Sequence, residues 1–387
     1  MDDGGSSVDG GSSVDGGPRD AGADDAGTSD GGSADAGSQD GGASDWWDEA
    51  FTRRVRIDLD TAGLASSLDE FPLFLQLPTD LIDLDAAQAT GADLRFIDAD
   101  GVTELAHDIE SFKNPGRSAI WVKLPRLDRG SDHLWVYFGN AGAPDAQRIT
   151  EVWSEGFAGV WHLADLATGP QQDASPSAED GTPRSFVGGE RVAGRVGQAL
   201  AFSGAIVLDM EGSANRSSFD FVQSYTLSAW VQVQVGGTVV AKREGGLAQW
   251  QLQLEAITVA EPQPSLIFTD AFGANCIFAA DQGLPAGSFH HIAVTVGAAG
   301  RPDAFYVDGA SVPFREVAAC SGAALHQLID VSIGARWAGD PAIGFPFAGV
   351  IDEVRVERVA RPAEWIAAQV AAMNGATVTY SPLESAP

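Results

Sequence analysis

One acidic residue stands among the apolar residues of a strong strand pattern near the C-terminus. In the stretch 345–356, a period of two places Asp352 on one face with Val350, Val354 and Val356. An ionised carboxylate is very costly to bury unless it gains hydrogen bonds, a cation or a metal. The sequence therefore predicts a specific partner for Asp352, either a structural cation or backbone N–H groups together with an arginine.

The sequence contains no Gly-x-Ser-x-Gly, His-Glu-x-x-His, Cys-x-x-Cys or Walker motif. Retaining glycosidases need two carboxyl groups about 5–5.5 Å apart. The nearest pattern is the run from Asp352 to Glu357, and strict alternation puts Glu353 and Glu357 on the face opposite Asp352. We expect a protein without catalytic activity, and a glycoside hydrolase or lyase is an alternative.

Two neighbouring histidines, His290 and His291, could suggest a metal or catalytic pair. Neighbours on a strand point to opposite faces and cannot bind one ion together. We expect them to be structural. A zinc site would need ligands such as His162 or Asp165 to be brought close by the fold.

Exposed tryptophans among polar residues are typical of carbohydrate sites, because sugar rings stack on them. Trp337 lies in a Gly-rich segment that predicts a loop, so we expect a glycan contact by Trp337 with Arg336 and Asp340. Trp230 shares its strand face with polar residues and is a second candidate. For both rings, packing in a core is the competing interpretation.

Composition limits the partners. The chain of 387 residues has a net charge of −31 and a pI near 4.2, which argues against nucleic acid and anionic membranes as partners. No apolar run is long enough to predict a transmembrane helix, and no signal-peptide pattern is present.

The first 45 residues are almost entirely Gly, Ser, Asp and Ala. Such a composition cannot bury a core and predicts a disordered linker over 1–45. We expect this linker to tether the protein to a surface, with a lipid anchor as one means of attachment.

Short alternating strand patterns, separated by turn residues, fill the rest of the chain. They predict an all-β protein with an antiparallel β-sandwich over 46–148, a second β domain over 149–375 and a C-terminal tail over 376–387.

The second β domain resembles a laminin-G-like, concanavalin A-type jelly roll over about 156–373. The likeness is carried by the segments 225–231, 289–295, 304–309 and 349–356, followed by 361–366. This resemblance implies the jelly-roll fold. It implies much less about function, because the fold is found in lectins, adhesion modules and enzymes.

The first β domain resembles a bacterial envelope domain of unknown function. The likeness rests on Trp47, on the segments 91–96 and 120–122, and on Val-Tyr-Phe-Gly-Asn at 136–140. The resemblance implies a bacterial, extracellular or cell-envelope setting, and no activity.

Laminin-G-like jelly rolls frequently bind calcium, so the resemblance makes calcium one candidate partner of Asp352. Asp165 and Asp209 are expected as further ligands, by position. The chain has two cysteines, Cys276 and Cys320, and an exported protein could bridge them or keep them as separate buried thiols.

Together these observations predict a secreted or cell-surface adhesion protein whose jelly roll binds polysaccharide or a glycoprotein. The alternative from another class is a structural envelope spacer that contacts protein and has no sugar site. An open groove bearing an aromatic residue on the jelly roll would favour the first, and a flat polar surface the second.

Overall fold

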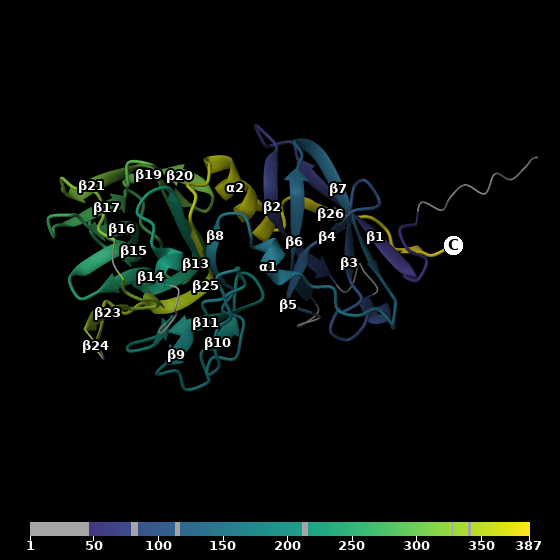
Figure 1. Cartoon of the computed structure of the whole chain (residues 1–387), viewed down its shortest axis with the longest axis horizontal. Coiled ribbons are helices and arrows are strands. Elements are labelled where there is room, and N and C mark those ends of the chain that lie inside the picture. The colour runs from purple at the N-terminus through teal and green to yellow at the C-terminus, as the bar shows by residue number, and fades with distance from the viewer. Residues whose placement is uncertain (1–45, 79–83, 113–116, 211–215, 327, 340–341) are drawn as a thin grey trace, which may run out of the picture. The chain divides into compact units, whose positions relative to one another are not determined.

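The computed structural model describes residues 46–78, 84–112, 117–210, 216–326, 328–339 and 342–387. The predictions for the linker at 1–45 and for Asp340 concern residues outside these ranges. The described part of the chain is all-β, as predicted, with antiparallel sheets and two short α-helices, α1 (Ile149–Val152) and α2 (Ala363–Met373) (Figure 1). Two 3-10 helices span Leu84–Ala86 and Arg216–Phe219.

The first β module is a sandwich of two sheets in the described residues. One sheet has the order β26 (Val378–Tyr380), β1 (Arg53–Thr61), β7 (Gly130–Phe138), β3 (Arg95–Asp98), β4 (Glu104–Leu105), with β27 (Glu384–Ser385) also on β1. The other has the order β2 (Leu68–Pro78), β6 (Arg117–Leu127), β5 (His107–Ser111). Alternating apolar side chains such as Val55, Ile57 and Leu59 fill the space between them.

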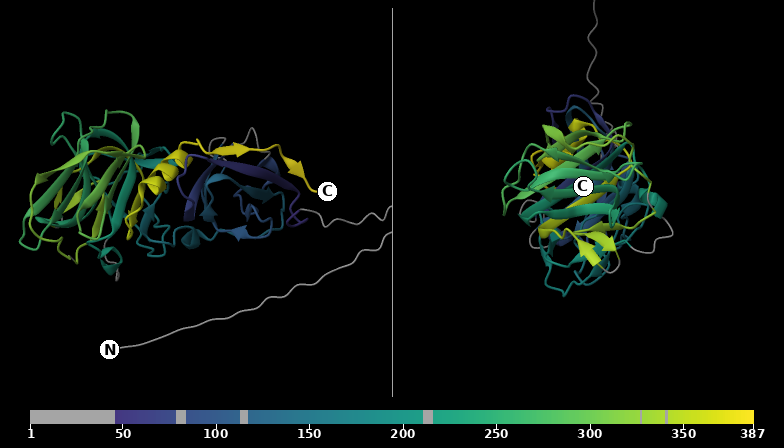
Figure 2. Two further views of the ribbon diagram at one scale, coloured as in Figure 1. Left: turned by 90° about the horizontal axis from the view of Figure 1, so that it is seen from above. Right: turned by 90° about the vertical axis from the view of Figure 1, so that its left-hand side faces the viewer.

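The C-terminal residues are part of this first module. Strand β26 pairs with β1 through Ile57 and Tyr380, and β27 pairs with the start of β1 (Figure 2). The prediction of a tail over 376–387 was therefore wrong. Strands β26 and β27 pair with β1, which lies far away in the sequence. Period-two patterns as short as these do not reveal such pairing.

Two larger sheets form the jelly roll. An eight-stranded sheet has the order β10 (Arg191–Ala193), β11 (Gln198–Phe202), β25 (Ala348–Glu357), β13 (Tyr225–Val235), β18 (Phe289–Val296), β19 (Pro302–Val307), β20 (Ala310–Val312), and β8 (Phe157–Trp161) also pairs with β25. A ten-stranded sheet has the order β21 (Phe314–Ala318), β17 (Asn275–Ala280), β16 (Gln263–Thr269), β15 (Leu247–Glu255), β14 (Gly237–Glu244), β22 (Val331–Ile333), β12 (Val207–Asp209), β9 (Thr182–Arg184), joined at β14 by the hairpin β23 (Arg336–Gly339) and β24 (Ala342–Gly344). The inner faces of these sheets share one apolar core.

The outer face of the eight-stranded sheet packs on the first module. Trp230 of β13 is 2% exposed and belongs to the same apolar cluster as Trp365 and Met373 of α2 and the core of the first module. Its indole Nε1 lies 3.0 Å from the sulfur of Met373. Trp230 therefore packs against α2, and it also lines a polar pocket together with Arg195 and Gln232. Its role in ligand binding stays a prediction.

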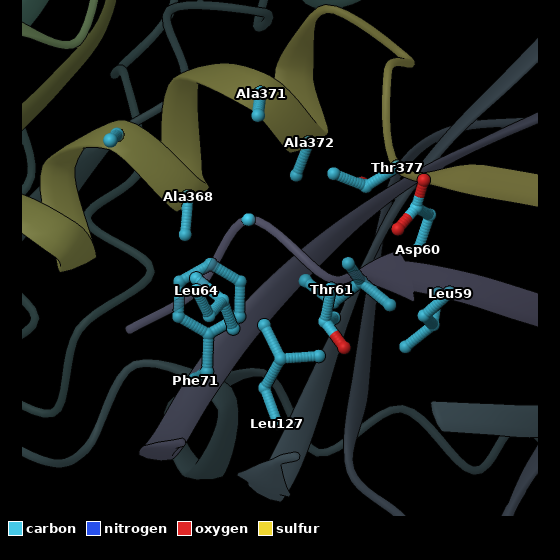
Figure 3. A pocket seen from close by; sticks show the side chains of 13 residues that line it. Leu59, Asp60, Thr61, Leu64, Phe71, Leu127, Ala368, Ala371, Ala372 and Thr377 are labelled. Atoms are coloured by element: carbon cyan, nitrogen blue, oxygen red, sulfur yellow. The ribbon is translucent and has the colours of Figure 1, made fainter. Parts of the chain in front are cut away.

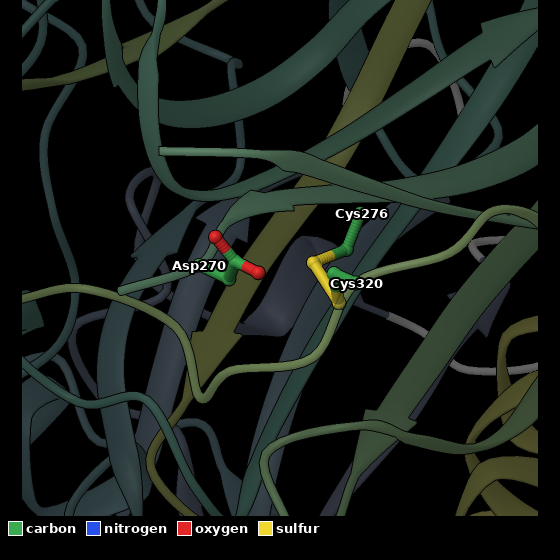
Figure 4. Close-up of side chains that lie close together, drawn as sticks. All are labelled: Asp270, Cys276 and Cys320. Carbon is green, nitrogen blue, oxygen red and sulfur yellow. A yellow bond between two sulfur atoms is a disulfide. The ribbon is translucent and has the colours of Figure 1, made fainter. Parts of the chain in front are cut away.

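The two cysteines form a disulfide. Cys276 of β17 is bonded to Cys320, 44 residues later in the chain, and Asp270 lies beside the bridge (Figure 4). The Asp270 carboxylate accepts hydrogen bonds from the backbone N–H groups of Phe272 and Ala274, each at 2.9 Å. The disulfide and the Asp270 carboxylate therefore stabilise the neighbouring loops. Since the two sulfurs are bonded to each other, neither offers a thiolate to a metal.

A buried histidine in the first module makes acid stability testable. Burial, with a smaller contribution from Arg95 and Arg148, lowers the pKa of His107 from 6.5 to about 4. Its ring is neutral in the folded protein, so stability is fully present above pH 6.5 and is lost as the pH falls from 6.5 towards 4. At about 1.4 kcal/mol per pKa unit, the loss is about 3 kcal/mol.

The variant His107→Phe is expected to remove this acid sensitivity, because neither ring nitrogen of His107 has a hydrogen-bond partner in the described part of the chain. Chemical denaturation of both proteins between pH 4 and pH 8 measures the difference. Parallel curves for the two proteins would contradict the assignment.

Candidate functional site

Strand β25 contains a bulge that turns Asp352 away from the jelly-roll core. Trp230 pairs with Asp352 and Ser228 pairs with Arg355, so β25 has one extra residue between these pairs, and Glu353 has a φ of 51°. The predicted face shared by Asp352, Val354 and Val356 was therefore wrong: the valines point into the jelly-roll core, while Asp352, the partner of Trp230, faces outward with it.

Asp352 has the backbone partners that one of the two predictions required. Its Oδ2 accepts hydrogen bonds from the N–H groups of Arg195 at 2.6 Å and Val196 at 2.9 Å, and its side chain is fully buried. Two backbone donors on one oxygen stabilise a buried carboxyl group without a cation.

Around Asp352, the bulge assembles a buried network of charged groups between the first module and the jelly roll. His162, directly after β8, has Nδ1 2.6 Å from Glu353 Oε1 and Nε2 3.1 Å from Asp108 Oδ2 on β5. Arg355 donates to Glu353 Oε2 at 2.8 Å. Glu110, on the same face of β5 as Asp108, has Oε2 3.9 Å from His162 Nδ1. We call His162, Asp108, Glu110, Asp352, Glu353 and Arg355 the junction cluster.

Aromatic rings enclose the junction cluster. The Arg355 guanidinium lies 4.5 Å from the Trp121 ring centroid and 4.9 Å from that of Trp153. Trp153 Nε1 donates to Asp108 Oδ2 at 2.9 Å. The side chains of Glu110 and Glu353 are each 1% exposed. A polysaccharide has no access to these carboxylates.

The junction cluster has more acidic groups than basic ones. Burial, together with the nearby Glu353 charge, raises the pKa of Glu110 and of Asp352 well above the usual range. Burial by itself would raise the pKa of Glu353, but the neighbouring His162 and Arg355 lower it. Burial by itself would lower the pKa of His162, but the Glu353 and Asp108 carboxylates hold it well above its usual range. Protons on Glu110, Asp352 and His162 would thus leave the cluster neutral.

The structure does not bring the predicted calcium ligands together. The carboxylate oxygens of Asp165, Asp209 and Asp352 do not form a group within 4.8 Å among the described residues. Asp165 accepts from the N–H of Gln172, and Asp209 pairs with Arg184 at 3.1 Å. Each carboxylate has its own protein partner, because the three lie on elements that the fold separates. Calcium binding itself stays a prediction.

A second candidate site lies on the outer face of the ten-stranded sheet. Along β15, Trp250, Leu252 and Leu254 point into the core, so Gln251 and Gln253 lie on the other face of the sheet, where both are buried. Gln251 Nε2 donates to Gln253 Oε1 at 2.6 Å, and Gln253 Nε2 donates to Glu255 Oε2 at 2.8 Å. The result is a row of planar amides that ends in a carboxylate.

This row borders a pocket of about 190 Å³, which we call the sheet groove. It is lined by polar and apolar side chains, namely Arg243, Gln253, Glu255, Ile267, Asn275, Ile277, Arg336 and Phe345. Neither Arg243 nor Arg336 forms an ion pair with a carboxylate in the part of the chain that the structure describes. Burial and the neighbouring Arg336 charge lower the pKa of Arg243 to about 10. The groove therefore holds two positive charges close together in a strongly acidic protein.

Of the predicted glycan-binding residues that the structure describes, only Arg336 lines the sheet groove. Trp337 lies in strand β23 rather than in a loop, does not line the groove, and donates its indole N–H to Asp209 at 3.3 Å. The Gly-rich sequence predicted a loop, but pairing with Glu244 of β14 and Ile343 of β24 extends the backbone there. Alternation along β23 then sends Trp337 and Arg336 in opposite directions.

The sequence contained a signal for the missed groove residues. The run Gln-Trp-Gln-Leu-Gln-Leu-Glu at 249–255 alternates strictly between polar and apolar. With Trp250 in the core, the glutamines had to face outward. Arg243 and Asn275 had no such signal, because only the pairing of the neighbouring strands places them beside β15.

A second pocket, between α2 and β2, differs in chemistry. It has a volume of about 210 Å³ and a mostly apolar wall that includes Leu64, Phe71, Leu127, Ala368 and Ala372 (Figure 3). Sugar hydroxyls need hydrogen-bond partners, and among the described residues of this wall only Asp60, Thr61 and Thr377 have polar side chains. Of these two pockets, the sheet groove is the better suited to a polar ligand.

These features define the class: a two-module β protein whose second module is a jelly roll. Residues 90–162 match the family model of a domain of unknown function (DUF2341), and residues 211–367 match that of the concanavalin A-like lectin/glucanases superfamily. The chain therefore carries these two domains in the predicted order. The first match contains Asp108, Glu110 and His162, and the second contains Glu353 and Arg355, so the junction cluster joins the two domains.

Several solved structures are similar at low identity. The binding domain of Paraclostridial Mosquitocidal Protein 1 is 12% identical, with 56% of this chain and 52% of that chain covered and a TM-score of 0.40. The binding domain of botulinum neurotoxin DC, solved with rat synaptotagmin II, is 9% identical over 57% and 52%, with a TM-score of 0.39.

Domain 4 of AbnA, an extracellular arabinanase from Geobacillus stearothermophilus solved with arabinotriose, is 19% identical over 55% of this chain and 98% of that one, with a TM-score of 0.35. This chain spans about half the length of the Paraclostridial Mosquitocidal Protein 1 binding domain that it matches. A comparison with curated proteins found no match. Among the residues that the structure describes, no helix has the length and apolar character needed to cross a membrane.

Proposed function

We propose that this protein binds polysaccharide through the sheet groove, and that the bound sugar carries an acidic group such as a uronate. The observation that carries the proposal is the pair Arg243 and Arg336, two guanidinium groups beside a row of amides. Neither forms a close ion pair among the described residues, and Glu255, which also lines the groove, is the carboxylate that acts on the Arg336 charge. Guanidinium groups bind carboxylates and sulfates through paired hydrogen bonds.

The rest of the groove suits a sugar ring. Asn275 and Glu255 offer an amide and a carboxylate to hydroxyl groups, while Ile267, Ile277 and Phe345 offer apolar surface to the C–H face of a ring. At about 190 Å³ the groove is smaller than the sites that hold drug-sized ligands, so it fits one ring of a longer chain. The concanavalin A-like fold supports a binding-domain role.

The setting that we propose is extracellular or at the cell envelope. The Cys276–Cys320 disulfide favours an oxidising compartment. The structural spacer without a sugar site is the competing proposal, and a groove lined by two arginines, amides and Phe345 favours binding over it.

The variant Arg336→Ala is expected to weaken binding to polygalacturonate, alginate or hyaluronan by at least about tenfold, because it removes one charge-assisted contact worth about 1.5–3 kcal/mol. Binding should also weaken as the salt concentration rises. Arg315→Ala, which removes an exposed arginine paired with Asp281, is the matched control and should bind like the wild type. Equal affinity of Arg336→Ala and wild type, or a preference for neutral dextran, would contradict the proposal.

A further inference from the structure

We propose that His162, Glu353 and Glu110 bind one divalent cation of the zinc type at the junction of the two β domains. Glu110 comes from β5, His162 from the end of β8 and Glu353 from β25. One ligand atom of each side chain lies within 4.8 Å of the others. The junction therefore brings one imidazole nitrogen and two carboxylates into the reach of a single ion.

The distances fit a small tetrahedral ion. Zinc binds nitrogen and oxygen at about 2.0–2.2 Å, so neighbouring ligand atoms of a tetrahedral site lie about 3.4 Å apart. His162 Nδ1 lies 2.6 Å from Glu353 Oε1 and 3.9 Å from Glu110 Oε2, and these values bracket that separation. Small side-chain shifts would bring all three into the ligand shell.

His162 is held as a metal-binding histidine usually is. Its far nitrogen Nε2 faces the carboxylate of Asp108, and Trp153 fixes the same Asp108 oxygen by a hydrogen bond at 2.9 Å. When an ion displaces the proton from Nδ1, this arrangement keeps the other proton on Nε2 and directs Nδ1 towards Glu353 and Glu110. A carboxylate behind the histidine is the common outer partner of zinc ligands.

Glu110 points independently to a ligand. Its side chain is 1% exposed and weakly held. Oε1 has no hydrogen-bond partner among the described residues, and Oε2, the oxygen near His162, accepts a long hydrogen bond from Trp121 Nε1 at 3.4 Å. Glu353 differs, since Arg355 holds its Oε2 and leaves Oε1 directed at His162. A buried carboxylate oxygen without a donor is costly, and a cation would satisfy it.

The ligand set selects the type of ion. Calcium needs six to eight oxygen ligands, whereas one imidazole with two carboxylates suits zinc, cobalt or manganese. Water would complete the tetrahedron. The ion would link β5 of the first domain to β25 of the jelly roll, so its expected effect is to stabilise the junction.

The test uses the full chain, kept oxidised so that the disulfide stays closed, stripped with a chelator and then titrated with Zn²⁺ and separately with Co²⁺. The wild type should take up one equivalent that Glu110→Gln binds at least about tenfold more weakly. Bound Co²⁺ should give the intense visible absorption of a tetrahedral site, and saturating Zn²⁺ should raise Tm by about 5 °C. Asp69→Asn, an exposed acid on β2, is the control and should bind like the wild type.

Three results would overturn the proposal. Equal Zn²⁺ uptake by wild type and Glu110→Gln would place the ion elsewhere, for example on acidic residues near the N-terminus. The weak visible absorption of octahedral Co²⁺ in the wild type would also contradict the tetrahedral site. This measurement needs no variant, so it counts even if Glu110→Gln fails to fold. A rise in Tm with Ca²⁺ but not with Zn²⁺ would support calcium instead.

Discussion

The variant Arg355→Met is expected to lose about 3–5 kcal/mol of the free energy of unfolding, because it leaves buried carboxylates without their compensating charge. Arg355 is 1% exposed, lies against the rings of Trp121 and Trp153, and donates to Glu353. Methionine fills much of the same space, so the loss would come from the unpaired charge of Glu353 rather than from a cavity. Urea denaturation at neutral pH measures it.

Two controls isolate this effect. Arg358→Met changes an exposed arginine directly after the same strand and should cost no more than about 0.5 kcal/mol. The double variant Arg355→Met/Glu353→Gln should be more stable than Arg355→Met, because it removes the charge that was left unpaired. A loss below about 1 kcal/mol in the single variant would show that the junction cluster does not depend on Arg355.

Removing the disulfide is expected to have an effect of similar size. The bridge closes a loop across 44 residues, which in the chain-entropy model corresponds to about 4 kcal/mol of stability. The double variant Cys276→Ala/Cys320→Ala, compared with the oxidised wild type in guanidinium chloride, measures it.

Reductant supplies the control for this second prediction. It should destabilise the wild type and leave the double variant unchanged, since the variant has no bridge to break. If reduction changes neither protein, the two sulfurs are not bonded in solution, and the alternative of two separate thiols holds.

The sequence predicted the fold class and the need for a partner at Asp352, but not the face on which Asp352 lies. Strict alternation assigns it to the valine face, and the extra residue at Glu353 reverses that assignment. A bulge depends on register with β13 and leaves no mark in the alternation itself. The junction cluster was therefore beyond sequence reasoning, since it also needs Asp108, Glu110 and His162 from distant segments.

The binding residues show the same limit. Trp337 was predicted from its Gly-rich surroundings, and strand pairing turns its side chain away from the groove. Trp230 was predicted from polar neighbours on its strand face, and the packing of α2 against its ring could not be foreseen from them. Arg336 lines the groove and its role in binding stays a prediction, while its neighbour Arg243 lies on a strand that only the sheet order brings near.

The most direct test of polysaccharide binding uses the isoleucine methyl groups of the sheet groove. Ile267 and Ile277 line it, whereas Ile57 and Ile120 lie in the core of the first module. An NMR titration with oligogalacturonate, and in parallel with a neutral cello-oligosaccharide, reports each site separately. We predict that oligogalacturonate shifts the methyl signals of Ile267 and Ile277, leaves those of Ile57 and Ile120 in place, and acts at lower concentration than the neutral sugar. Unchanged signals of Ile267 and Ile277 at saturating oligogalacturonate, or shifts confined to other isoleucines, would contradict the account.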